Sequence, residues 1–186
     1  MEKEKTRSFI AIDLPIEIRE YIKEVQNLIK KKNLFTGKFT EPENLHLTLK
    51  FLGEIDQETI KKVKQKLKKI NKEEFYAKLE KTGVFSSKYN SYVRVIWIKI
   101  SGEINKLQKQ VDETLKDLFE KEHRFMSHVT IARVKKTHNK QKIINYVNNL
   151  KISQKKFKVN KFYLKKSDLK PMGPIYKDLE EYELKK

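Results

Sequence analysis

The spacing of apolar residues divides the chain into strands and helices. Alternating or dense apolar residues predict strands over 8–14, 45–52, 74–85 (one strand or two short ones), 91–100, 128–134, 155–165 and 175–184. Apolar residues three or four positions apart predict helices over 15–32, 56–70, 103–121 and 141–150. Gly, Pro and polar residues between these segments predict loops over 33–44 and 167–174 and a turn over 86–90.

This order of elements mixes helices with hairpin-like pairs of strands. It favours an α+β fold with antiparallel or mixed sheets. The chain has 186 residues, a length typical of one domain, and no linker rich in Gly, Ser or Pro divides it. We therefore expect one domain over 1–186. Trp97 lies in a strongly apolar segment and is expected in the core.

The charge balance points to a class of partner. The 43 Lys and Arg outnumber the 25 Asp and Glu and give a net charge of +18. Such a surface attracts polyanions, most commonly nucleic acid; the alternative is a solvated lysine surface that only maintains solubility. The absence of Cys excludes disulfides, thiolate metal sites and Cys nucleophiles. Neither a membrane-spanning apolar run nor a signal-peptide pattern is present, so we expect a cytoplasmic protein.

A repeated tetrapeptide is the most informative feature of the sequence. His46-Leu47-Thr48-Leu49 recurs as His128-Val129-Thr130-Ile131. Both copies have the form His, apolar, Thr, apolar, and both lie in predicted strands. Because side chains alternate along a strand, the His and Thr of each copy share one face and the apolar residues anchor the other. The same alternation places Lys50 on the face of His46 and Phe51 on the opposite, apolar face.

Two such polar faces can form a catalytic cleft if two lobes pack with them facing each other. One imidazole would remove a proton from the attacking group, and the other would protonate the leaving oxygen. An unperturbed His pKa near 6.5 lets both protonation states exist near neutrality. The Thr48 and Thr130 hydroxyls can bind non-bridging phosphate oxygens. This arrangement suits phosphodiester chemistry without a metal, although the residues alone do not decide which of His46 and His128 is the acid.

Each of these residues also has a plainer interpretation. A single His-x-Thr is usually only a half-exposed strand, so the pairing of two copies carries the hypothesis. A zinc site would need His46, His128 and a third ligand from His123, His138 or a carboxylate. His123 and His138 lack the pattern and are expected at the surface. Lys50 is expected to be solvated.

The two motifs and their flanks resemble the 2H phosphoesterase superfamily. Within it the sequence is most similar to the RNA 2′,3′-cyclic phosphodiesterases, long called 2′-5′ RNA ligases. The resemblance covers nearly the whole chain and rests on the segments Arg7–Ile12 with Leu14 and Pro15, Pro42–Gly53, His128–Arg133 and Ser167–Tyr176. One departure is Ser127, where the family usually has Pro.

The resemblance implies a bilobal fold with the cleft between its sheets. It implies hydrolysis of RNA 2′,3′-cyclic phosphate ends to 2′-phosphates, with His46 as proton donor and His128 as acceptor; fragments of tRNA are one candidate substrate. Arg133 matches a family arginine and is a candidate phosphate ligand, but an ideal strand would point it away from the cleft unless a bulge or twist returned it. No cofactor and no metal are implied. A monomer is expected, because the cleft needs no partner.

Three alternatives share the same cleft or surface. The enzyme could be a 2′-5′ RNA ligase, which runs the reaction in reverse, or a 2′-5′ oligonucleotide phosphodiesterase. The chain could also be a non-catalytic module that holds RNA ends. Four aromatic residues are candidates to stack on a terminal base, although core packing or a lid contact is the more common role of such residues: Phe9, Phe51, Phe125 and Tyr176.

Overall fold

The computed structural model describes residues 4–86, 93–171 and 173–186. Its helices are α1 (Ile16–Lys31), α2 (Gln57–Leu67), α3 (Ile104–Thr114) and α4 (Lys140–Asn149), with a 3-10 turn, η1 (Pro42–Asn44). Its strands are β1 (Lys5–Asp13), β2 (Phe35–Phe39), β3 (His46–Asp56), β4 (Phe75–Ser86), β5 (Val93–Gly102), β6 (His128–Thr137), β7 (Lys156–Val159), β8 (Lys161–Lys170) and β9 (Gly173–Glu183).

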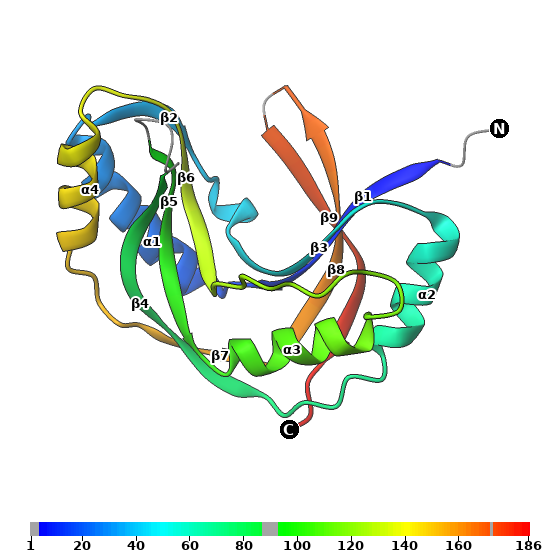
Figure 1. Cartoon of the computed structure of the whole chain (residues 1–186). Coiled ribbons are helices and arrows are strands. Elements are labelled where there is room, and N and C mark those ends of the chain that lie inside the picture. Colours follow the sequence, from blue (N-terminus) through cyan, green and yellow to red (C-terminus); the bar gives the residue numbers. More distant parts are fainter. Residues whose placement is uncertain (1–3, 87–92, 172) are drawn as a thin grey trace.

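The strands form one strongly curved sheet that makes two lobes (Figure 1). The strand order is β7-β4-β5-β6-β3-β1-β8-β9, with β2 added beside β6, and neighbouring strands run antiparallel. We call the part with β1, β3, β8 and β9 lobe A and the part with β2, β4, β5, β6 and β7 lobe B. The lobes meet where β3 pairs with β6 through Leu47 and Val129.

Two helices cover the outer side of each lobe, and their assignment crosses between the halves of the chain. Helix α1 comes before β3 in the sequence but packs on lobe B, where it contacts β6. Helix α3 comes before β6 but packs on lobe A, where it contacts β3. The helix that precedes each motif strand in the sequence therefore packs on the lobe that carries the other motif.

The predicted α+β architecture with two lobes is confirmed, but several element boundaries differ. The predicted loop 33–44 contains β2, because Gly37 lacks a side chain and lets β2 approach the β6 backbone at Arg133. The predicted helix 103–121 ends at Thr114. The segment 155–165 is divided between β7 and β8, and 167–174 belongs largely to the β8–β9 hairpin rather than a loop. Residues 87–92 and 172, with most of the predicted turn 86–90, lie outside the described residues.

The core follows the apolar pattern of the sequence. Apolar residues of β1, β3, β5, β6 and β8 are buried together with one side of each helix, in a single cluster that extends through both lobes. Trp97 is 9% exposed, as expected, and its indole covers Gly83 of the neighbouring strand. No helix in the described part of the chain is long and apolar enough to cross a membrane.

Candidate active site

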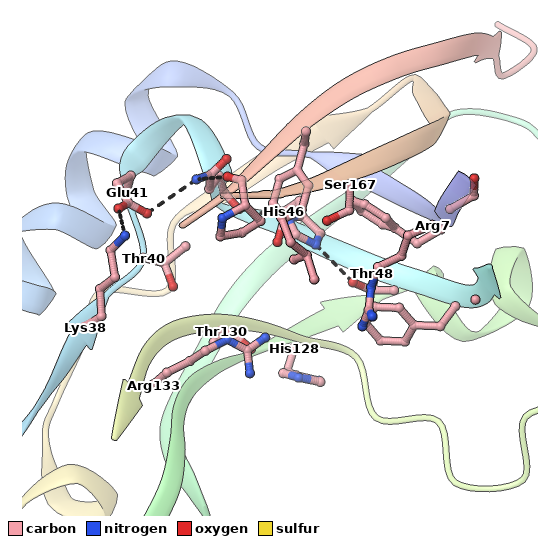
Figure 2. A pocket seen from close by; sticks show the side chains of 18 residues that line it. Arg7, Lys38, Thr40, Glu41, His46, Thr48, His128, Thr130, Arg133 and Ser167 are labelled. Carbon is pink, nitrogen blue, oxygen red and sulfur yellow. Dashed lines mark hydrogen bonds and ion pairs between the residues drawn. The ribbon is translucent and has the colours of Figure 1, made fainter. Parts of the chain in front are cut away.

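A cleft of about 490 Å³ lies where the two lobes meet. It brings together all five residues that the sequence singled out (Figure 2): His46, Thr48, His128, Thr130 and Arg133. The first two come from β3 of lobe A and the other three from β6 of lobe B. The predicted opposition of two His-Thr faces is thus present in the fold.

The backbone selects the tautomer of both imidazoles. His46 Nδ1 lies 2.8 Å from the carbonyl oxygen of Asn44, and His128 Nδ1 lies 2.7 Å from that of Met126. A carbonyl only accepts hydrogen bonds, so each Nδ1 donates and each Nε2 is unprotonated when the ring is neutral. His46 Nε2 accepts a 3.1 Å hydrogen bond from the Thr48 hydroxyl. Each motif therefore presents a ring nitrogen that can take up or release a proton.

Aromatic rings enclose the two histidines. Phe9 and Tyr176 each lie 5.0 Å from the His46 ring, centroid to centroid. Phe85 packs edge-on against His128 at 5.1 Å. The Asn44 side chain donates to the Pro174 carbonyl at 3.2 Å and so ties the start of β3 to the β8–β9 hairpin that carries Tyr176.

This enclosure makes both imidazoles weak bases. Burial lowers the pKa of His46 from 6.5 to about 4, with smaller opposing contributions from the Asn44 carbonyl and the Asp13 carboxylate. Burial also lowers the pKa of His128, against a contribution from the Met126 carbonyl. The positive charge of Arg133 lowers the pKa of both rings further. In the free protein at neutral pH, both histidines are neutral.

A β-bulge in β3 overturns the predicted facing of two residues. Ala11 pairs with Thr48 and Ile10 with Lys50, so Leu49 is an extra residue in the ladder. The extra residue reverses the alternation for Lys50 and Phe51, until a further register shift at Leu52. Phe51, predicted on the apolar face, is 70% exposed and lines the cleft. Lys50, predicted on the His46 face and solvated, is 6% exposed; both predictions are wrong for the same geometric reason.

Two acceptors hold the buried Lys50 ammonium. Its Nζ donates to Asp112 Oδ1 of α3 at 2.5 Å and to the Glu120 carbonyl at 2.6 Å. The other Asp112 oxygen accepts from Gln108 Nε2 at 2.6 Å and from the Glu122 backbone N–H at 3.1 Å. The network fastens the segment after α3, which leads to His128, onto the strand that carries His46.

A second bulge lies at the matching place in β6. Trp97 pairs with Thr130 and Ile96 with Ala132, so Ile131 is the extra residue. The bulge turns Arg133 into the cleft. An ideal strand would have pointed this side chain away, so a bulge or twist was the condition for Arg133 to bind phosphate. Arg133 and Phe51 are thus counterparts, each five residues after the histidine of its motif.

Other cleft residues were less visible in the sequence. Arg7, Lys38, Thr40, Glu41 and Leu169 also line it. The motif spacing does not identify them, because they reach the cleft from β1, from β2 and the segment after it, and from the β8–β9 hairpin. Phe125 lines a different surface cavity together with His123. In the ranges that the structure describes, no group of three or more His, Cys, Asp or Glu residues is placed to hold a metal ion.

Comparisons with known proteins show what the chain is similar to. The family described as "LigT like Phosphoesterase" matches residues 12–97 and 98–176, one match for each motif. An RNA 2′,3′-cyclic phosphodiesterase of Methanocaldococcus jannaschii is 37% identical, over 95% of this chain and 99% of that protein. One of Archaeoglobus fulgidus is also 37% identical, over 95% and 99%.

Solved structures show the same fold. The crystal structure of TT0787 of Thermus thermophilus matches with a TM-score of 0.81 and 28% identity, over 96% of this chain and 97% of that one. Escherichia coli LigT complexed with 3′-AMP matches with a TM-score of 0.75 and 25% identity, over 98% and 100%.

Proposed function

This chain belongs to the LigT-like phosphoesterase family, and from that membership we propose that it hydrolyses RNA 2′,3′-cyclic phosphate ends to 2′-phosphomonoesters. The observation that carries the proposal is the pair of opposed His-Thr faces in one cleft. The names of the relatives supply the substrate, and the net charge of +18 suits an RNA ligand. The unit that acts is the whole two-lobed domain, 1–186, since one core cluster extends through both lobes.

In the proposed mechanism, water attacks the phosphorus of the cyclic phosphate. Neutral His128 accepts the proton of that water through Nε2 as the new P–O bond forms. The bond from phosphorus to the 3′-oxygen breaks, and protonated His46 donates its Nε2 proton to that oxygen. The products are a 2′-phosphate and a 3′-hydroxyl, and the two histidines have exchanged protonation states. No cofactor or metal takes part.

The low pKa of His46 means that the donor must gain its proton together with the substrate. A cyclic phosphate carries a negative charge, and an anion beside an imidazole raises the pKa of that imidazole. Thr48 holds the His46 Nε2 in the free protein and would turn its hydroxyl to a phosphate oxygen once that nitrogen is protonated. Arg133 and Thr130 supply further donors to the phosphate from lobe B.

In the proposed complex, the ring of Phe51 binds the terminal nucleobase. Its ring is 70% exposed within the cleft and lies 6.2 Å from the ring of Phe9. An exposed ring beside a phosphate site offers a stacking surface that any base can use. The RNA end would then lie with its base on lobe A and its phosphate between the lobes, and fragments of tRNA are among the RNAs that carry such ends.

The same cleft could also join RNA ends. If an RNA 5′-hydroxyl replaced water, the reaction would form a 2′-5′ linkage, and its reverse would cleave one. Both histidines come from one chain, which supports a monomer as the working unit. We further propose that the enzyme acts in the cytoplasm, on the ground that its substrate is RNA.

One assay tests the proposal directly. An RNA oligonucleotide ending in a 2′,3′-cyclic phosphate is incubated, with EDTA present, with wild type, His46→Ala, His128→Ala and the exposed-histidine control His138→Ala. We expect wild type and His138→Ala to give a 2′-phosphate, and the other two to be slower by roughly 10²–10⁴. No ring opening by wild type, with RNA still bound, would refute the hydrolase and favour a binding module.

A further inference from the structure

The bulge at Ile131 leaves a backbone carbonyl that β5 cannot satisfy. An extra residue in a ladder places its polar groups out of register with the partner strand. Two donors outside that ladder bind the Ile131 oxygen instead: the Thr40 backbone N–H at 3.0 Å and the Gln26 side chain at 2.8 Å. A buried carbonyl without such partners would be destabilising, so this bulge depends on them.

Gln26 suits this task because its amide nitrogen carries two hydrogens. Nε2 donates to the Ile131 oxygen at 2.8 Å and to the Thr40 oxygen at 2.8 Å. Both partners are carbonyls, which only accept, so the amide nitrogen must face them. The residue is 6% exposed and lies on α1, whose other buried residues are apolar. Gln26 thus connects the bulge of β6 to Thr40, which itself lines the cleft.

Lobe A also has a buried polar contact between a helix and its bulge. There the residue after the extra one, Lys50, is held by Asp112 of α3. In both lobes the buried polar group comes from the helix that precedes the motif strand of the other lobe in the sequence (Figure 1). Gln26 binds the backbone carbonyl of the extra residue in β6, and Asp112 binds the side chain of the residue after the extra one in β3.

We propose that Gln26 is a positioning residue for the reaction: it holds the Ile131 bulge of β6 so that Arg133 stands in the cleft. This inference rests on the proposed function, because Arg133 is its point of action. If the bulge were lost, the alternation along β6 would shift by one residue, and Arg133 would leave the cleft. Gln26 itself does not line the cleft and does not touch the substrate.

The test compares Gln26→Met, which keeps length but removes both donors, with Arg133→Met and the double variant. Val25→Ala is the matched control, since Val25 is the buried neighbour of Gln26 on α1 and makes no contact through a polar side chain. The measurements are kcat/KM on the RNA substrate and the affinity for inorganic phosphate. We expect Gln26→Met to lower each roughly ten- to hundredfold, the effect of losing one hydrogen bond to a charged group.

Non-additivity distinguishes positioning from a general loss of stability. The double variant should be no worse than Arg133→Met alone, because Gln26 then has nothing left to position. An NMR titration adds an independent readout. Loss of the Arg133 charge from the cleft should raise the pKa of His46 and His128 in both single variants, because both variants keep the Asp13 and Lys165 charges that also act on His46. Val25→Ala should leave both values as in wild type.

Several results would overturn the inference. They are additive losses in the double variant, an equal effect of Val25→Ala, wild-type phosphate affinity in Gln26→Met, or an Arg133→Met variant with wild-type kcat/KM and phosphate affinity. Absence of hydrolysis by wild type would refute the proposed function instead. In that case the phosphate affinities and the titration, which need no turnover, would still decide the role of Gln26.

Discussion

The acidity of the buried histidines predicts an unusual dependence of hydrolysis on pH. With a pKa of about 4, His46 carries a proton in roughly one free molecule in a thousand at pH 7. The competent free enzyme holds one proton, on His46, while His128 is neutral. The fraction of enzyme in this form is constant between the pKa values of the two histidines, and it falls about tenfold per pH unit outside that range. We therefore expect kcat/KM to be bell-shaped, with its maximum between about pH 4 and 6.5.

The profile of kcat should lie at higher pH than that of kcat/KM. kcat reports on the enzyme with substrate bound, and the phosphate anion favours the protonated form of both imidazoles. Their pKa values therefore rise, and the whole bell moves towards neutrality. The assay measures initial rates on a short RNA with a cyclic phosphate end, from pH 3.5 to 9, at constant ionic strength and both below and above KM.

Two outcomes would refute this reasoning. One is a kcat/KM that increases through neutrality to a plateau, which would mean that a single group of higher pKa controls the reaction. The other is the same bell for kcat and kcat/KM, which would mean that the substrate anion does not reach the histidines. His138→Ala should reproduce both wild-type curves, because that side chain is exposed and outside the cleft.

Three further predictions concern stability, specificity and metals. Lys50→Met should lower the free energy of unfolding by about 3–5 kcal/mol in urea denaturation, because it leaves the Asp112 carboxylate buried without its cation. Adding Asp112→Leu should restore part of that loss, since Gln108 and the Glu122 N–H then lose their acceptor, and no recovery would contradict the pairing. Phe51→Ala should raise KM roughly tenfold for a substrate with a terminal base but not for the abasic analogue, by loss of stacking; equal effects on both would exclude stacking. EDTA should leave the rate unchanged, and a loss that zinc restores would revive a metal site.

The sequence predicted the site better than the details of its strands. The repeat and the alternation of side chains placed His46, Thr48, His128 and Thr130 in one cleft, because those residues lie before either bulge. Beyond Leu49 the same alternation failed for Lys50 and Phe51. A bulge depends on pairing with a strand that is distant in the sequence, so the local pattern of apolar residues does not predict it.

The missed elements have the same origin. β2 contains Gly37 and mostly exposed residues, so its segment has no strand pattern, and it pairs only because β6 offers an edge. The end of α3 is set by the network around Asp112, where the Glu122 N–H turns back to the carboxylate. Apolar spacing continues through Leu118 and Phe119, which pack on the core without being helical. Long-range contacts, not local propensity, decided both cases.

The contact between β3 and β6 has a mechanical consequence. Leu47 and Val129, the pair that joins the lobes, each lie between the His and the Thr of their motif. If one lobe rotated about that contact, the His and Thr side chains of the two motifs would move little, because they lie next to the axis. The rim, where the β8–β9 hairpin and β2 lie, would move much further. Insertions or drift in the rim can change which RNA fits, while the reacting groups keep their separation. A protein built this way can acquire new substrates in evolution without rebuilding its chemistry.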